Sequence, residues 1–542
     1  MKCRPILFLA SLCLLPVCLS AQTLDPEALH RPPTDTWPTY NGDYSGQRYS
    51  TLSQINASNV KSLTLAWTHH VDFGSESYAQ QASEGRRIKS TPLLVDGVLY
   101  FTITDNVWAM DALTGRELWH YAWPNNRAIH VANRGVGMYG SWLYFMSPDN
   151  YLVSLNAKDG TERWRVQVAD VKLDFFSATS PLVIGKHVIV GPGNNDNIRA
   201  WLESRDPETG ALQWKWWVDP EPGEKGSETW VDNATMAKGG GFPWLTGTYD
   251  SELNLYYLGT GNGVPMDRAP HPTPEGDSLY TASIVALNPD TGKLVWAYQV
   301  TPHDTHDYDA GQTPIIFDGE FQGKQRKLLA QASRNGYYFL LDRVTGEHLL
   351  TTKFMPDTNW AKGIDKEGRP IPDYAKDANP PGTLVSPYPI GATNWWSPSY
   401  DPKLGLIFVN AARTWAYFTT SGYGRFRSPP DYVLNAIDYK TGKVVWTHEL
   451  GDKSGVLISG LLTTAGNLVF GGDSVGNFLG MDPATGKTLW HVNLGQFVTN
   501  APMTYTLYGR QYLLVAANDT WFAFALPEDE DKGSDHDHVK GH

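Results

Sequence analysis

The chain has 542 residues, of which 44 are Lys or Arg and 57 are Asp or Glu, so its formal net charge is −13. This acidic balance argues against nucleic acid as a partner, because nucleic-acid binding relies on basic surfaces that neutralise phosphates. All three cysteines lie within residues 1–21, so the rest of the chain offers no disulfide, zinc–thiolate site or thiol nucleophile.

Residues 1–21 have the layout of a cleaved export signal. Basic residues precede the apolar run 6–19, and two small residues follow it. The run is too short to be a stable membrane anchor. Lipidation at Cys18 is the weaker alternative, because a Pro-Val pair stands before it where small residues are normally needed. Cleavage removes Lys2 and Arg4 and no acidic residue, which changes the formal net charge from −13 to −15. We expect a periplasmic or secreted protein.

A turn motif recurs along the rest of the chain. In its first copy, Asp111 opens a turn that contains Thr114 and Gly115 and is followed by Trp119. The acidic or amide side chain caps its own turn, and glycine takes the positive φ that the turn requires. The seven copies span residues 111–119, 156–164, 206–214, 288–296, 342–350, 438–446 and 482–490. The fifth copy ends in Leu350 in place of tryptophan.

Short runs of alternating apolar and polar residues lie between these turns, as in residues 91–102, and they predict β-hairpins. Most neighbouring copies are 44 to 54 residues apart, which suits a four-stranded propeller blade, and two gaps of 82 and 96 residues predict long loop insertions. Trp67 ends an apolar strand before the first copy and supplies an eighth unit. We therefore predict an all-β, eight-bladed propeller that forms one domain over residues 22–526, with a disordered polar tail at 527–542.

The segment richest in chemically active groups is residues 301–310, which contains three carboxylates and two imidazoles. Asp307 and Asp309 are two residues apart, so in extended backbone their side chains point the same way and both could reach one cation. Paired oxygen ligands suit a hard ion such as calcium or a trivalent lanthanide, and not zinc. A solvated loop with Asp caps is the structural alternative.

Two further regions offer groups for a planar ligand near Gly-rich turns. Residues 258–265 place Asn262, a neutral oxygen ligand, between glycines. Trp244 follows a Gly-rich turn, and residues 394–396 have the sequence Asn-Trp-Trp, so both supply indoles that could stack on a flat ring. A plain turn and packing between blades are the structural alternatives.

Together these motifs resemble the pyrroloquinoline-quinone (PQQ)-dependent alcohol dehydrogenases, the quinoprotein family that includes the large subunit of methanol dehydrogenase. Residues 40–50 and 52–56 resemble the family's N-terminal signature, and the Thr-Gly-x-x-x-Trp turns resemble its docking motifs. The resemblance implies a planar quinone at the channel mouth, stacked on a tryptophan. It also implies a metal ion on one quinone carbonyl and an aspartate beside the substrate hydroxyl.

Most of the family's site motifs have counterparts in this sequence. The resemblance places the catalytic base of the Pro-His-Asp-x-x-Asp motif at Asp307 and the metal-binding asparagine at Asn262. Asp309 is similar to the extra aspartate of members that use lanthanides, and the stacking tryptophan matches Trp244. The cofactor contacts that the resemblance implies fall on Arg134, Arg334, Asn394, Trp395, Thr179 and Lys89.

Three departures mark a divergent member. The two adjacent cysteines of methanol- and ethanol-type members are replaced by Ala128 and Ile129. The metal-binding glutamate of the family aligns with Asn195, so either this residue or Asp196 supplies that ligand. A glutamate that contacts the quinone is replaced by Lys89, which could pair with a cofactor carboxylate.

We therefore expect an enzyme in which the metal polarises a quinone carbonyl, Asp307 removes the alcohol proton and a hydride moves from carbon to the quinone. An inward-facing Asp309 favours a trivalent lanthanide, and a solvent-facing one favours calcium. The sequence contains no Cys-x-x-Cys-His haem motif, so we expect a separate electron acceptor such as a soluble c-type cytochrome.

Two other functions fit parts of the sequence. A scaffold propeller of the outer-membrane-assembly type would hold other proteins and no cofactor, and it would not need the site residues together. A sugar-oxidising quinoprotein would differ mainly in channel insertions such as Asn359 to Val385, a Pro-rich loop that we expect to cover the mouth.

Overall fold

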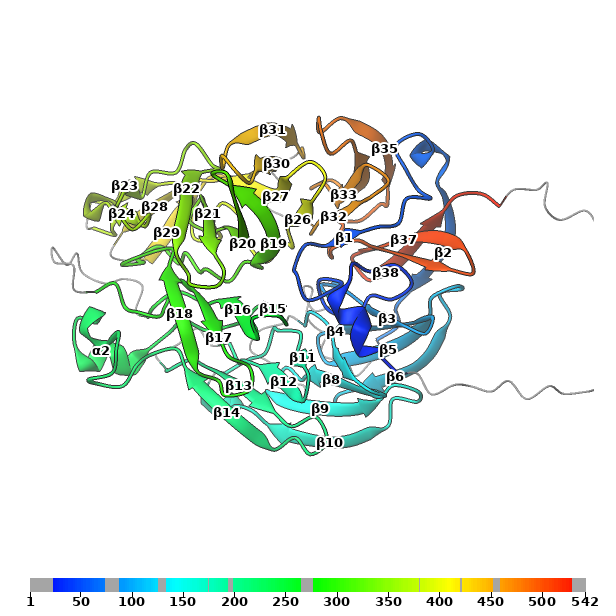
Figure 1. Cartoon of the computed structure of the whole chain (residues 1–542), viewed down its shortest axis with the longest axis horizontal. Coiled ribbons are helices and arrows are strands. Elements are labelled where there is room, and N and C mark those ends of the chain that lie inside the picture. Colours follow the sequence, from blue (N-terminus) through cyan, green and yellow to red (C-terminus); the bar gives the residue numbers. More distant parts are fainter. Residues whose placement is uncertain are drawn as a thin grey trace, which may run out of the picture.

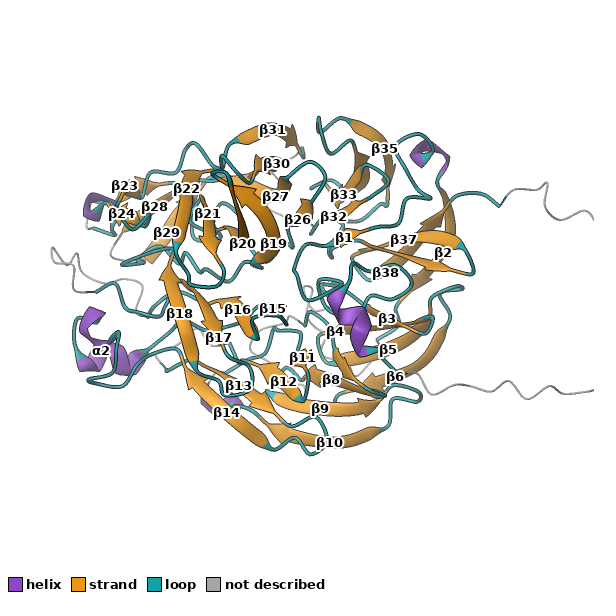
Figure 2. Cartoon of the chain, viewed as in Figure 1, coloured by secondary structure: helices purple, strands orange, loops and turns teal. Residues whose placement is uncertain are grey.

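Strands make up nearly all the regular structure, and they are arranged in a ring (Figure 1 and Figure 2). In this computed structural model the described residues are 23–73, 87–124, 133–173, 175–193, 198–264, 276–379, 381–419, 422–451 and 459–528. The expected export signal and all but the first residues of the polar tail lie outside them. Within these ranges, no helix has the length and apolar character needed to cross a membrane.

Eight sheets, each with four antiparallel strands, form the blades and confirm the predicted eight-bladed β-propeller. Blade 1 contains β3 (Leu93–Val95), β4 (Val98–Ile103), β5 (Asn106–Asp111) and β6 (Glu117–Ala122). Blade 2 contains β7 (Gly137–Tyr139), β8 (Trp142–Met146), β9 (Tyr151–Asn156) and β10 (Glu162–Gln167). Blade 3 contains β11 (Leu182–Ile184), β12 (His187–Val190), β13 (Trp201–Arg205) and β14 (Leu212–Trp217). Blade 4 contains β15 (Thr248–Asp250), β16 (Leu255–Gly259), β17 (Ser283–Leu287) and β18 (Leu294–Gln299).

The second half of the ring repeats this order. Blade 5 contains β19 (Ile315–Phe321), β20 (Lys324–Ala332), β21 (Tyr337–Asp342) and β22 (His348–Lys353). Blade 6 contains β26 (Ser399–Asp401), β27 (Leu406–Arg413), β30 (Asp431–Asp438) and β31 (Val444–Glu449). Blade 7 contains β32 (Leu462–Thr464), β33 (Leu468–Gly472), β34 (Asn477–Met481) and β35 (Thr488–Asn493). The first strand of blade 7 also pairs in parallel with the short β1 (Tyr49–Ser50).

Blade 8 combines the two ends of the chain. Its strands β36 (Met503–Leu507), β37 (Arg510–Ala517) and β38 (Thr520–Ala525) are C-terminal, and β2 (Thr64–His70) pairs antiparallel with β38 as the fourth strand. Figure 1 shows the blue N-terminal strand against the red C-terminal strands. Trp67 lies in β2 and donates from Nε1 to the Ala112 carbonyl at 3.2 Å. It therefore supplies the eighth unit that the sequence predicts.

The two long gaps contain insertions, as expected. The first holds the 3-10 turn η4 (Ser227–Thr229) and the helix α2 (Asn233–Lys238). The second holds β23 (Ala361–Ile364), β24 (Pro370–Pro372), η5 (Tyr374–Lys376), β25 (Thr383–Val385), β28 (Ala416–Thr419) and β29 (Gly422–Arg427). Strands β25, β28 and β29 form a small sheet outside the blades. The other 3-10 turns are η1 (Pro26–His30), η2 (Val60–Ser62) and η3 (Val171–Leu173).

Six of the indoles, those of Trp67, Trp119, Trp164, Trp214, Trp296 and Trp446, pack against the glycine turn of the next blade, whereas Trp490 packs edge-on against Phe524 of blade 8. Trp119 of blade 1 lies on the turn of blade 2, where its Nε1 donates to the Ala157 carbonyl at 3.0 Å. Gly160 of that turn has a φ of +71°, and a Cβ there would lie 2.6 Å from the indole. Glycine is therefore required both by backbone conformation and by the approach of the ring. Because an indole buries a large apolar area, this contact holds neighbouring blades together.

The fifth copy, which has no tryptophan, contacts the turn of the next blade in a different way. The turn glycine of blade 6, Gly442, lies against Thr352 of β22. The hydroxyl of Thr352 donates to the Gly442 carbonyl at 2.8 Å. A strand-to-turn hydrogen bond thus replaces the indole contact between blades 5 and 6.

The N-terminal segment 34–50 crosses one end of the ring beneath the first strands of the blades. Backbone amides in the first strands of blades 4, 5, 6, 7 and 8 donate to carbonyls of this segment, and its Trp37 pairs with Leu94 of blade 1. Arg48 is 1% exposed and donates to three carbonyls, those of Tyr40, Leu461 and Pro502, at 2.7 to 2.9 Å. This buried cation is therefore satisfied by neutral oxygens that come from both ends of the chain.

We expect Gly160→Ala to destabilise the protein more than Gly185→Ala. Both glycines have positive φ, +71° and +54°, but a Cβ at position 185 would meet nothing within 4 Å. The shared backbone cost is about 1–2 kcal/mol, and the clash with Trp119 adds about 1–3 kcal/mol. Denaturant unfolding measures the difference. An equal loss of unfolding free energy in the two variants would contradict the proposed contact between the indole and the glycine turn.

Candidate active site at the channel mouth

Most of the site residues expected from the sequence stand just before the first strand of a blade. Lys89, Arg134, Thr179, Trp244 and Asn394 precede β3, β7, β11, β15 and β26. The first strands start at the same end of the ring because every blade repeats one up-and-down order. Residues far apart in sequence therefore gather at one mouth of the channel.

Arg134 occupies a slot between two indoles. Its guanidinium carbon lies 5.1 Å from the ring centroid of Trp244 and 5.2 Å from that of Trp395. Nη1 donates to the Ala178 carbonyl at 2.5 Å, and Nε has no hydrogen-bond partner. Burial lowers the pKa of Arg134 to about 10. No carboxylate among the described residues forms an ion pair with this buried cation, so this part of the mouth suits a ligand that carries negative charge.

Asp309 connects three other groups of the site. It accepts hydrogen bonds from Trp244 Nε1 at 3.1 Å and from the Asn262 backbone amide at 2.6 Å, and it pairs with Arg334. Arg334 Nη2 also lies 2.8 Å from Asp307 Oδ2. The structure thus brings the two carboxylates, the asparagine, the arginine and the indole together.

The backbone between the two aspartates differs from the expectation. Asp307 has a φ of +69°, so the segment is not extended and strand alternation does not align the side chains. A turn places them instead, because the Asp304 carboxylate accepts from the backbone amides of His306 at 2.9 Å and Tyr308 at 2.8 Å. Asp307 and Asp309 then converge on Arg334.

Negative charge exceeds positive charge in this part of the site. Burial raises the pKa of Asp304 to about 6, and it raises the pKa of Asp307 well above its usual range, while Arg334 opposes the second shift. Asp309 adds a third carboxyl group beside one guanidinium. A cation bound among these oxygens would lower the repulsion, so the donor set fits a hard metal ion. The Asn262 side chain could add an amide oxygen, since its Nδ2 donates to the Gly263 carbonyl at 3.0 Å.

The remaining expected residues differ in how far they face a ligand. Asn394 uses Nδ2 to donate to the Ile390 carbonyl and Oδ1 to accept from the Trp395 amide, at 2.7 and 2.8 Å, so it shapes the loop that presents Trp395. Thr179 is buried and its hydroxyl lies 3.5 Å from that of Thr246. Lys89 is buried. The expected metal ligands Asn195 and Asp196, and the replaced cysteine positions Ala128 and Ile129, lie outside the described residues.

Sequence reasoning missed two sets of residues around the site. Gln312 accepts from the Arg334 backbone amide at 3.0 Å, and Asp377 of the second insertion accepts from Thr305 at 2.6 Å. Both contacts join segments that no local pattern relates. The insertion 359–385, which we expect to cover the mouth, contacts the loop that carries Asp307.

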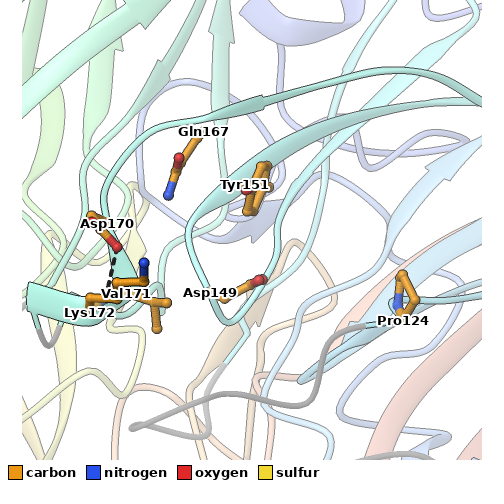
Figure 3. Close-up of a pocket in the computed structure, with 7 residues that line it drawn as sticks. All are labelled: Pro124, Asp149, Tyr151, Gln167, Asp170, Val171 and Lys172. Carbon is orange, nitrogen blue, oxygen red and sulfur yellow. Dashed lines mark hydrogen bonds between the residues drawn. The ribbon is translucent and has the colours of Figure 1, made fainter.

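A separate surface pocket of about 560 Å³ lies over blade 2 and contains none of the expected site residues. Figure 3 shows its lining side chains, including Asp170, whose carboxylate accepts from the Lys172 backbone amide. The pocket is lined by Pro124, Asp149, Tyr151, Gln167, Asp170, Val171 and Lys172. This pocket is therefore distinct from the candidate site.

Comparison with known proteins agrees with this geometry. The family model for the "Glucose/ethanol/alcohol dehydrogenase, beta-propeller domain" matches residues 37–377 and 421–513. The chain is 36% identical to quinohemoprotein alcohol dehydrogenase of Comamonas testosteroni, over 89% of this chain and 72% of that protein. It is 34% identical to quinoprotein alcohol dehydrogenase PedH of Pseudomonas putida, over 95% of this chain and 92% of that protein.

Solved structures give the same result. The Comamonas testosteroni enzyme superposes with a TM-score of 0.84 at 32% identity, covering 94% of this chain and 84% of the other. A europium-containing methanol dehydrogenase superposes with a TM-score of 0.80 at 26% identity, covering 93% and 100%. The chain belongs to the PQQ-dependent alcohol dehydrogenase family, and it is an enzyme of that type and not a scaffold propeller.

We expect Arg134→Ala to weaken PQQ binding about ten- to a hundredfold. PQQ is a planar polyanion, and a hydrogen bond to a charged group contributes about 1.5–3 kcal/mol. Arg165→Ala is the matched control, because this arginine also lies over an indole, that of Trp123 at 4.7 Å, but belongs to the outer strand β10 of blade 2. Tryptophan-fluorescence titration with PQQ measures both affinities. Equal affinity in Arg134→Ala and the wild type would remove Arg134 from the binding site.

Proposed function

We propose that the protein oxidises an alcohol in the periplasm with metal-bound PQQ and passes the electrons to a separate c-type cytochrome. The observation that carries this proposal is the convergence of Asp307 and Asp309 on Arg334, next to the Trp244 indole. One site thus combines an accessible carboxylate, oxygen donors for a cation and an aromatic surface for a planar ring.

The cofactor would be held by charge and by stacking. Trp244 is partly exposed and offers an indole face, while Arg134 supplies an unpaired positive charge beside it. When bound, PQQ would supply hydride-acceptor chemistry, and a metal ion would supply Lewis-acid chemistry. Asn262, Asp307 and Asp309 would hold the metal, with Asn195 or Asp196 as a further ligand.

Asp307 would remove the hydroxyl proton of the alcohol. Its side chain is 21% exposed, whereas that of Asp309 is 6% exposed, so Asp307 is the carboxylate that a substrate can reach. Arg334 holds Oδ2 of Asp307 at 2.8 Å, which fixes the orientation of the carboxylate. A metal ion bound beside Asp307 would favour its ionised form and so oppose the rise in its pKa that burial causes.

Asp309 supports a trivalent ion in preference to calcium. Its carboxylate faces inward, toward the Asn262 amide and Arg334, so it adds charge to the metal-binding side. The similarity to a europium-containing methanol dehydrogenase supports the same choice.

The acidic surface expected for the mature chain suits a cytochrome with a basic docking face.

Asp307→Asn tests the assignment of the base. Asparagine has the same shape and tolerates positive φ, but it cannot accept the proton. We expect kcat to fall about 10²- to 10⁴-fold while PQQ binding stays near the wild-type level. Dye-linked alcohol oxidation with added PQQ and metal measures the loss, and wild-type turnover in this variant would refute the assignment.

Asp309→Ala separates the two metal hypotheses. Removing one carboxylate weakens a trivalent ion more than a divalent ion, because the lost Coulomb energy scales with the charge of the metal. We expect lanthanum-supported turnover to fall at least about tenfold and calcium-supported turnover to fall less. Unchanged turnover with lanthanum would remove Asp309 from the coordination shell.

A further inference from the structure

We propose that Asp377, in the second insertion, is a positioning residue that holds the loop 303–309 in the conformation required by Asp307. The proposal rests on the proposed role of Asp307 as the base. It assigns to the insertion a positioning role, in addition to the covering of the mouth that we expect from the sequence.

The loop adopts a conformation that its own residues disfavour. His303 has a φ of +51° and Asp307 has a φ of +69°. Residues with a side chain avoid this region, so such conformations persist only where surrounding contacts enforce them. The direction of the Asp307 carboxylate depends on this backbone, and therefore on what holds the loop.

Asp377 makes the contacts at the start of the loop. Its Oδ1 accepts from the Thr305 hydroxyl at 2.6 Å, and its Oδ2 lies 3.4 Å from His303 Nε2. The side chains of His303 and Asp377 are 1% and 3% exposed. One carboxylate therefore contacts the loop at a residue of positive φ and again two residues before Asp307, in an environment where water does not compete.

The neighbouring residue of the insertion supports the same segment. The Lys376 carbonyl accepts from His306 Nε2 at 2.9 Å. The ring of Tyr374 packs edge-on against His303, with centroids 5.0 Å apart. The dipeptide 376–377 thus fixes both residues that directly precede Asp307.

The other anchors of the loop come from different parts of the chain. Asp304 holds the middle of the loop through two backbone amides, and Arg334 holds its end through the two carboxylates. The base of the insertion is joined to the Arg334 loop, because Trp360 Nε1 donates to the Asn335 carbonyl at 2.8 Å. The insertion that carries Asp377 is therefore hydrogen-bonded to the residue that follows Arg334.

The test compares Asp377→Ala with Asp373→Ala in the full-length protein. Asp373 precedes the same 3-10 turn and caps it by accepting from the Ala375 amide at 3.2 Å, but it is only partly buried. We expect Asp377→Ala to lower kcat about ten- to a hundredfold with PQQ affinity and KM within about twofold of wild type. A larger isotope effect on a deuterated alcohol would show that the chemical step has slowed. An equal loss in Asp373→Ala would show that the turn as a whole, and not the Asp377 contact, is responsible, and would overturn the proposal.

Variants of Thr305 give a second, milder test. Thr305→Val keeps the shape and removes the donor, so we expect the same loss as in Asp377→Ala and no further loss in the double variant. Thr305→Ser keeps the donor and should turn over at close to the wild-type rate. Wild-type kcat in both Thr305→Val and Asp377→Ala would overturn the proposal. If Asp307→Asn is inactive in that case, the proposed function stands and only the positioning role is lost.

Discussion

The contact between an indole on one blade and a glycine turn on the next holds the ring together, and the site depends on the ring. Arg134, Thr179, Trp244, Asp309 and the Trp395 loop come from different blades or from connections between blades. A small change in the angle between blades would change every distance across the mouth. The indole Nε1 bonds, which span 2.6 to 3.2 Å for Trp67, Trp119, Trp214, Trp296 and Trp446, and the missing Cβ of the turn glycines fix that angle with local geometry. The same repeating device thus provides both stability and alignment.

The mouth separates charge in a way that matches a polyanionic cofactor with a bound cation. Arg134 lies beside two indoles with no carboxylate partner in the described part of the chain, whereas Asp307 and Asp309 share Arg334 and Asp304 lies in the same loop. Each side is electrostatically unfavourable alone, because buried charges need partners. Such an arrangement persists in functional sites, where a ligand completes the balance.

The fold could be predicted from sequence because each blade carries its own local signal. The turn around Gly115 and the strand alternation before it are short-range patterns, and Trp67 extends them to the eighth blade. The site was harder to predict from the sequence than the fold. Family resemblance indicated Asp307, but alternation gave the wrong backbone for it, because that argument applies to strands and this residue lies in a turn. The contact of Asp377 with Thr305 spans 72 residues and has no local signal.

The pairing of β2 with β38 has a consequence for how the molecule is made. The last blade needs a strand from the beginning of the chain and three from its end, so the circle cannot shut until synthesis and any passage across a membrane are complete. Until then the incomplete ring has unpaired sheet edges, which are prone to association with other chains. The channel mouth therefore reaches its final shape only after the last strand has paired with β2.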